Sequence, residues 1–397
     1  MENTTKKIYY ISTRDVRKNR ADAVHIMLTC QSFSNNGINV ELITPSVKRD
    51  EYVVDKSSVF SLYGIDKPNF SFTELKTKIS EINEKKTKPF RIVFEKFKAY
   101  SHFCIRNRKE LKSDKVIVYS KCYISTLPFI VFKTLGLIKP KIVFEAITPK
   151  NSLLHRIIYK KSDKIISHLK FVTKDIIAFA KVTEDKIFEP AFFTQTKAVD
   201  EIKASKLELR KELKLKPYET YVLYAGKAGE KVKQVQYFIE AASKIPSLTF
   251  LIVGANNKGI KAFDKIKSEK FINNLEVYPF QPLVDYYKFV LASDILIGYY
   301  PPTHHNKYHL SPGKSGIYFA SKNPCVFSDL PSLRSLFPEG VAFYAESDNV
   351  RSLVATINDV NRNEVLAKEV ANNAYDFASK SSYDRFADSI IHFIYST

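Results

Sequence analysis

The chain has 397 residues, of which 45% are hydrophobic and 26% charged, a composition typical of a folded protein with two domains. No run of 18 apolar residues occurs and the four cysteines lack CxxC spacing, which argues against a membrane-spanning helix, a disulfide framework or a zinc–cysteine site. The formal net charge is +20; residues 1–200 carry 37 Lys/Arg against 21 Asp/Glu, and residues 201–397 carry 25 against 21. The basic first half predicts an anionic partner, namely a phospholipid surface, a pyrophosphate-linked acceptor or nucleic acid.

Short β-rich runs alternate with helical patterns along the chain. In the first half the predicted strands are residues 7–12, 39–44, 115–120, 141–146 and 164–168. After a Lys-rich connector the pattern restarts, with predicted strands at 221–226, 248–254, 275–280, 295–300, 324–329 and 341–346. These apolar runs suit parallel strands buried on both faces. The sequence therefore predicts an α/β protein of two Rossmann-like, doubly wound domains facing an interdomain cleft.

The predicted domain boundaries follow from the restart of the strand pattern. We expect a first domain over residues 1–200 and a second over 201–375. Residues 376–397 are predicted to form a terminal helix that packs back on the first domain. The polar start of the chain leads straight into a strand-like run, which favours a cytosolic protein over a secreted one.

The segment SPGKSG, residues 311–316, has the composition of a phosphate-binding turn. A nucleotide-hydrolysing P-loop needs a glycine five positions before Gly313, and Tyr308 stands there. The segment also fits a helix start, with Ser311 as the N-cap and Pro312 as the first helical residue. The free N–H groups of such a start bind phosphate, although a capped helix that binds nothing has the same pattern.

A second basic turn follows the strand predicted at residues 221–226. Its sequence is GKAGEKVKQ, in which Lys227, Lys231 and Lys233 precede a helical pattern. Taken singly, such lysines are typical of a solvated turn. This turn and SPGKSG, however, are both expected at carboxyl ends of strands in one open sheet, where doubly wound folds bind their ligands.

Taken together, these segments resemble the group 1 glycosyltransferases, family 4 in the usual classification, which have the GT-B fold. The resemblance spans nearly the whole chain. RADAVHIMLTCQSFSNNGINVELITP (20–45) resembles the first helix and second strand of the domain distant from the donor. YAGKAGEKVKQVQYFIEAA (224–242) resembles the family's strand, basic turn and helix, and residues 291–337 contain S-P-x-K and D-L-P-S motifs.

The resemblance implies a retaining, metal-independent transferase whose second domain binds a nucleotide-diphosphate sugar as co-substrate, with no other cofactor. Lys227 and Lys233 match the basic pair that neutralises the donor diphosphate. Glu145 matches a carboxylate of the first domain, although a strand-end carboxylate that pairs with a lysine has the same pattern. These three are the predicted catalytic residues. The predicted donor-binding residues are Gly226, Ser311, Pro312, Gly313, Lys314, Phe280 and His309.

One motif of the family is missing from this chain. The family's E-x7-E pair, with one glutamate near the donor sugar and one on the nucleotide ribose, aligns with His309 and Ile317. Isoleucine cannot accept hydrogen bonds from ribose hydroxyls. The alternative function is therefore a non-catalytic GT-B relative that acts as a binding or scaffold protein.

Three further clusters each leave two interpretations open. The basic loop at residues 14–20 suits either an acceptor phosphate or a solvated turn. Residues 85–109 are basic with phenylalanines near helical spacing, which suits a helix on an anionic bilayer or one covering the first sheet. His304, His305 and His309 either line the donor-sugar side or belong to a surface loop; their spacing is not that of a metal site, and no metal is predicted.

The sequence thus predicts a cytosolic glycosyltransferase, peripheral on the inner face of the cell membrane, that works in surface polysaccharide biosynthesis. Its expected partners are a nucleotide-sugar donor, a glycan or lipid-linked acceptor, and an anionic membrane surface. Charge alone suggests nucleic acid, but no known nucleic-acid-binding module occurs in the sequence, so no specific nucleic acid is expected.

Overall fold

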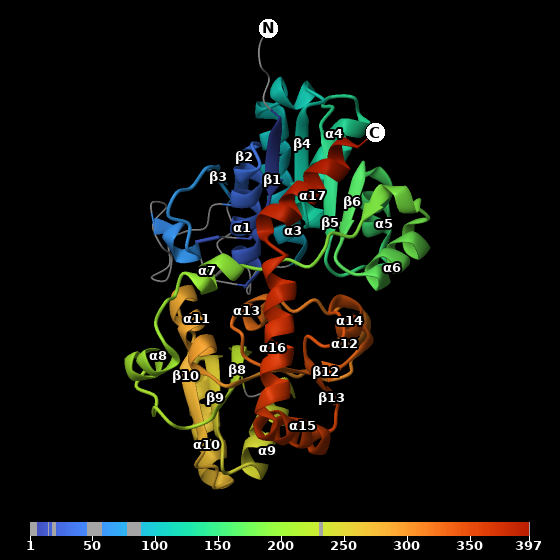
Figure 1. Cartoon of the computed structure of the whole chain (residues 1–397). Helices are drawn as coiled ribbons and strands as arrows, with labels where there is room; N and C mark the ends of the chain where they lie inside the picture. The colour runs from blue at the N-terminus through green and yellow to red at the C-terminus, as the bar shows by residue number, and fades with distance from the viewer. Residues whose placement is uncertain are drawn as a thin grey trace. The chain divides into compact units, whose positions relative to one another are not determined.

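The chain forms two compact units in its computed structural model (Figure 1). The structure describes residues 6–14, 16–17, 21–45, 58–77, 89–229 and 233–396. The first unit comprises Met1–Ala191 and Tyr383–Thr397, and the second comprises Phe192–Ser382. The chain therefore passes between units at 191/192 and 382/383, whereas the sequence placed the boundaries after residues 200 and 375.

The first unit is built on a parallel sheet with the strand order β3-β2-β1-β4-β5-β6-β7. Its strands are β1 (Lys7–Ile11), β2 (Asn39–Pro45), β3 (Ser71–Leu75), β4 (Val116–Ser120), β5 (Lys141–Ala146), β6 (Lys164–Ser167) and β7 (Ile187–Phe188). Its helices are α1 (Ala21–Asn35), α3 (Pro89–Arg106), α4 (Tyr123–Thr134), α5 (Leu153–Lys161), α6 (Lys170–Ala180) and α17 (Tyr383–Tyr395), with short 3-10 turns η2 (Ser61–Tyr63), η3 (Glu110–Lys112) and η4 (Glu184–Lys186). The last helix, α17, packs beside α1, and Asn35 Nδ2 donates to Asp384 Oδ1 at 3.1 Å.

The second unit repeats this plan with a parallel sheet in the order β10-β9-β8-β11-β12-β13. Its strands are β8 (Tyr221–Ala228), β9 (Thr249–Ala255), β10 (Leu275–Pro279), β11 (Ile295–Gly298), β12 (Cys325–Asp329) and β13 (Phe343–Glu346). Its helices are α7 (Thr196–Asp200), α8 (Lys206–Glu212), α9 (Lys233–Lys244), α10 (Asn257–Glu269), α11 (Leu283–Ala292), α12 (His304–His309), α13 (Lys314–Ala320), α14 (Pro331–Leu336), α15 (Val350–Arg362) and α16 (Glu364–Ser379). No helix among the residues described is both long and apolar enough to cross a membrane.

Strand β8 shows why an unbroken apolar run forms a central strand here. Successive side chains of a strand point to opposite faces of the sheet. Tyr221 and Leu223 accordingly pack into one apolar cluster of the second unit, and Val222 and Tyr224 into another. Because both faces are covered, residues 221–225 of β8 are all buried. The predicted pair of doubly wound α/β domains is confirmed.

The strand order determines where each unit can hold a ligand. In a doubly wound sheet the ligand crevice lies outside the carboxyl ends of the two strands between which the order reverses. In the first unit those strands are β1 and β4, and in the second they are β8 and β11. The residues that directly follow these four strands are therefore the first place to look for functional side chains.

Candidate functional site

In the second unit, the carboxyl end of β8 brings its backbone close to a lysine from α13. Gly226 has φ +146, and a Cβ placed on it would lie 3.2 Å from Lys314 Nζ. A side chain at this position would crowd the ammonium group. Glycine here allows both the unusual backbone angle and the close approach of Lys314 to the strand end.

Lys314 has aromatic neighbours and, within the described part of the chain, no anionic partner. Its Nζ lies 4.1 Å from the centroid of the Tyr224 ring and 5.7 Å from that of the Tyr300 ring. Tyr224 belongs to β8, and Tyr300 lies just after β11. No described residue forms an ion pair or a hydrogen bond with this ammonium group. Burial lowers the pKa of Lys314 to about 7, because the loss of water around the ammonium group disfavours its charged form. A cation held at a switch point, with no counter-ion among the residues that the structure describes, is well suited to bind an anion.

The sequence predicted a helix start with Ser311 as the N-cap, and this position is wrong. Helix α13 begins at Lys314, with Gly313 at the N-cap, whereas Ser311 is exposed and precedes the helix. The physical reason is a tight turn: the Pro312 carbonyl accepts from the Ser315 N–H at 3.1 Å and from the Ser315 hydroxyl at 2.6 Å. Neither Ser311 nor Pro312 therefore takes the predicted place in the helix.

The other predicted donor-side residues have varied environments. Lys227 is exposed, and its carbonyl accepts from the Tyr224 hydroxyl at 3.2 Å. The side chain of Lys233 and the whole of Lys231 lie outside the described residues. Phe280 follows β10 with its ring 57% exposed, and His309 is buried at the end of α12 with its ring centroid 5.4 Å from that of His304.

Ile317, which stands where the family has its ribose-binding glutamate, has apolar surroundings. The side chain lies on α13 and is buried in the same apolar cluster as Tyr300 and Tyr318. A carboxylate there would lose its hydration among apolar groups. The position that aligns with the family's ribose-binding glutamate thus belongs to the hydrophobic core of this unit.

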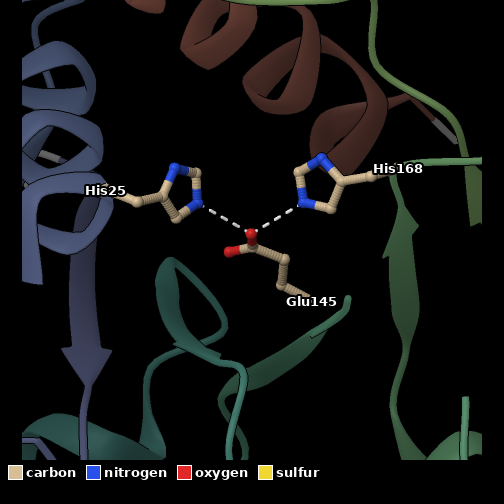
Figure 2. A group of neighbouring side chains, drawn as sticks. All are labelled: His25, Glu145 and His168. Atoms are coloured by element: carbon tan, nitrogen blue, oxygen red, sulfur yellow. Dashed lines mark hydrogen bonds and ion pairs between the residues drawn. The ribbon is translucent and has the colours of Figure 1, made fainter. Parts of the chain in front are cut away.

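In the first unit, Glu145 near the end of β5 is the centre of a hydrogen-bonded cluster (Figure 2). His25 Nε2, from α1, and His168 Nε2, just after β6, each lie 2.8 Å from Glu145 Oε1. The Tyr119 hydroxyl, from β4, donates to Oε2 at 3.0 Å. The glutamate is 1% exposed, so its carboxylate is stabilised by hydrogen bonds from these neighbours rather than by water.

Local charges set the protonation of this cluster. Burial by itself would raise the pKa of Glu145, but His25, Lys121 and the histidine hydrogen bonds together hold it well below its ordinary value. Burial, followed by the charge of Lys121, lowers the pKa of His25 to about 4. At neutral pH the cluster therefore contains an ionised carboxylate beside a neutral His25 imidazole, an arrangement that can orient a base or ligate a metal ion.

Sequence reasoning selected Glu145 but not its partners. His25 and His168 are 120 and 23 residues away from it, so no short motif connects them. One signal was available: β5 pairs with β6 in parallel, with Glu145 opposite Ile166, which places His168 just beyond the neighbouring strand end. His25 could be identified as a partner of Glu145 only from the packing of α1 in the folded unit.

The fold is shared with solved glycosyltransferases over nearly the whole chain. A glycosyltransferase from Rickettsia africae matches with a TM-score of 0.73 at 14% identity, covering 98% of each chain. HepE of Anabaena, solved in complex with UDP and glucose, matches with a TM-score of 0.67 at 12% identity and the same coverage. WaaG, a glycosyltransferase involved in lipopolysaccharide biosynthesis, matches with a TM-score of 0.67 at 12% identity, covering 98% of this chain and 100% of its own.

At these identities the likeness establishes the fold alone. The chain has the fold of the GT-B glycosyltransferases, with two Rossmann-like units. No protein-family model and no curated protein sequence matches the chain.

Proposed function

We propose that the chain is a retaining glycosyltransferase, independent of metal for its transfer chemistry, that takes a sugar from a nucleoside-diphosphate donor. The observation that carries this proposal is Lys314, a partly buried lysine at the switch point of the second unit with no anionic partner among the described residues. In this proposal the second unit binds the donor, and Lys314 contacts its diphosphate.

The chemistry of transfer explains why such a cation is needed. As the glycosidic bond breaks, the departing nucleoside diphosphate gains negative charge. A preorganised donor or cation aimed at that charge stabilises the transition state by about 3 kcal/mol in comparable oxyanion sites. Gly226 allows Lys314 to approach the strand end, and we assign Lys227 and Lys233 to the same diphosphate.

We assign the acceptor to the first unit. Both carboxylate oxygens of Glu145 already accept hydrogen bonds, so we propose that it positions His25 and His168 rather than contacting the sugar. HepE with UDP-glucose and WaaG support a nucleotide-sugar donor and a surface glycan as substrate classes. The acceptor is then a glycan or lipid-linked intermediate of surface polysaccharide biosynthesis.

The alternative is a GT-B relative that binds without catalysis, and Ile317 favours it. Its apolar surroundings leave the nucleotide ribose without a carboxylate at that position of α13. The two candidates differ in what they bind. A transferase must hold a nucleotide, whereas a scaffold of this fold need not.

Calorimetric titration of the purified chain with UDP, GDP, ADP, TDP and CMP tests the proposal. We expect saturable binding of one nucleoside diphosphate, followed by release of that diphosphate from the corresponding nucleotide sugar. If a diphosphate binds and no sugar nucleotide turns over with any acceptor extract, the protein is a binding relative. If none of the five nucleotides binds to the folded chain, the donor site itself is wrong.

We further propose a cytosolic location and peripheral contact with an anionic membrane through α3. Phe90 and Phe94, one turn apart, have side chains that are 81% and 54% exposed, and the exposed Arg91 and Lys98 lie on the same helix. Exposed aromatic rings beside cations are typical of helices that lie on anionic bilayers. This feature favours the bilayer interpretation of residues 89–106 over a helix that only covers the sheet.

Co-sedimentation with vesicles tests this contact. We expect binding to phosphatidylglycerol-containing vesicles and little to pure phosphatidylcholine. The double variant Phe90→Ser/Phe94→Ser should bind at least about 10-fold more weakly, because burying each ring contributes roughly 1.5–3 kcal/mol. Phe271→Ser, which removes an 87% exposed ring from the second unit, is the matched control and should bind normally. Equal binding by the double variant would exclude α3 as the contact.

A further inference from the structure

The cluster of His25, Glu145 and His168 has the donor set of a divalent metal site. The two imidazole nitrogens and a carboxylate oxygen all lie within 4.8 Å of one another. Figure 2 shows both rings pointing their Nε2 atoms at the same carboxylate from opposite sides. Two histidines and one carboxylate, with water in the remaining positions, form a well-known ligand set for zinc and related ions.

The surroundings of the three ligands resemble the outer shell of a metal centre. Metal-bound histidines usually direct their other ring nitrogen at a hydrogen-bonding group that fixes the ring. His25 Nδ1 lies 3.3 Å from the Tyr383 hydroxyl, and the free oxygen of Glu145 accepts from Tyr119 at 3.0 Å. The His25 ring and the Glu145 carboxylate are thus held by neighbouring hydroxyls, so that an ion would meet these two ligands already oriented.

A buried hydroxyl beside the cluster lacks a partner. Tyr10 Oη has no hydrogen-bond partner among the described residues, and the Tyr10 side chain is fully buried. Its ring centroid lies 5.1 Å from that of Tyr119, which itself contacts Glu145. Unpaired buried hydroxyls are uncommon, and a metal-bound water is a group that could satisfy this one.

The distances are close to those that an ion requires. Ligand atoms at about 2.0–2.2 Å from a tetrahedral zinc ion lie roughly 3.4 Å apart. The two Nε2···Oε1 separations are 2.8 Å, so each must open by about half an ångström for the ion to enter.

One neighbour opposes the ion. The charge of Lys121, the residue that follows β4, acts on both His25 and Glu145. A positive charge that acts on these ligands opposes the binding of a dication, and its removal leaves all three ligands in place. Its removal should therefore tighten binding, a result that a purely structural histidine–glutamate cluster would not give.

We propose that His25 Nε2, His168 Nε2 and Glu145 bind a divalent transition-metal ion of the zinc class in the first unit. The sequence predicted no metal because its three ligands come from distant segments with no spacing motif. The donor chemistry assigned to Lys314 does not involve this site, so that assignment stands or falls independently of the ion. His25, Glu145 and His168 are the residues assigned above to the acceptor side, and the ion would be held there.

The test uses the full chain without a histidine tag, treated with a chelator and desalted. It is titrated with Co²⁺, whose visible absorption reports the ligand set, and then with Zn²⁺ in competition. We expect one tight ion per chain with nitrogen-and-oxygen tetrahedral or five-coordinate absorption. His168→Gln should weaken binding by at least about 100-fold, since it removes a ligand rather than an outer-shell group. His392→Gln, which removes an 81% exposed histidine of the same unit, should bind as the unmodified chain does.

Lys121→Met keeps all three ligands and provides the second variant if His168→Gln fails to fold. It should bind Co²⁺ at least a few-fold more tightly than the unmodified chain. No ion bound by the unmodified chain would overturn the proposal. Full affinity retained in folded His168→Gln would also overturn it, because the ion would then lie elsewhere, for example at His304, His305 and His309. Unchanged affinity in Lys121→Met would exclude a site beside that lysine.

Discussion

Lys314→Met is expected to weaken binding of the cognate nucleoside diphosphate by about 100-fold or more and to abolish detectable transfer. Loss of a partly buried cation that pairs with a charge on the ligand costs about 2–5 kcal/mol of binding free energy. A loss of about 2.7 kcal/mol weakens the affinity 100-fold. Methionine keeps most of the side-chain volume beside Tyr224, so the packing is preserved. The measurement is calorimetric titration of the variant.

The same substitution should stabilise the protein in a pH-dependent way. The pKa of Lys314 is about 7 in the folded chain against an ordinary value of 10.5, so between these values the unfolded chain binds the extra proton. The free energy of unfolding therefore rises with pH from about 7 to 10.5, and the cost of burying the charge is fully present below pH 7. Lys314→Met removes that cost and should melt at a higher temperature at pH 6, with a smaller difference at pH 9.

Lys307→Met is the matched control for both measurements. Lys307 is exposed on the neighbouring helix α12. Its replacement should change neither the nucleotide affinity nor the melting temperature appreciably. Undiminished nucleotide affinity in Lys314→Met would remove the central residue from the proposed donor site, even if the stability effect appeared.

Gly254→Ala is expected to destabilise the second unit by about 3 kcal/mol or more and to lower nucleotide affinity at the same time. Gly254 has φ +115, and an added Cβ would lie 2.3 Å from the Gly226 carbonyl oxygen and 2.8 Å from the Gly226 carbonyl carbon. Backbone cannot yield as a flexible side chain can, so β8 and β9 must move apart where they meet. That movement displaces Gly226, next to Lys314.

Gly37→Ala is the control that measures the cost of a positive φ alone, without the steric clash expected in Gly254→Ala. Gly37 has φ +78 and nothing within 4 Å of an added Cβ. Its replacement should cost only about 1 kcal/mol and leave nucleotide binding unchanged. Urea denaturation followed by circular dichroism measures both variants. If Gly254→Ala costs no more than Gly37→Ala, the close packing of these two strand ends is not a constraint on the site.

The fold could be predicted from the sequence because its strands are buried on both faces. Apolar runs such as those of β8 and β9 differ clearly from the helical patterns between them. The two strands that were missed lack this signal. Strand β3, SFTEL, has a serine, a threonine and a glutamate in five residues, and β7 has only two residues.

The candidate site could be predicted only in part. Sequence motifs identified single residues, whereas the neighbours of each residue depend on how distant segments pack. The S-P-x-K motif pointed to Lys314, but its aromatic surroundings come from β8 and from the chain after β11. The helix start failed at Ser311 because the Ser315 side chain, rather than the expected cap, closes the turn on Pro312. Glu145 was selected by the family resemblance, whereas the two histidines that hydrogen-bond to it are brought to it only by the packing of α1 and of β6 beside β5.

The location of the bound nucleotide is the most direct test of the account. The nucleoside diphosphate that binds in calorimetry should be added at saturation, and amide hydrogen exchange should be followed by mass spectrometry with and without it. We expect slowed exchange in the peptides that contain residues 224–229 and 311–320 of the second unit. Protection confined to the first unit, or none in the peptides around Gly226 and Lys314, would contradict a donor site at this switch point.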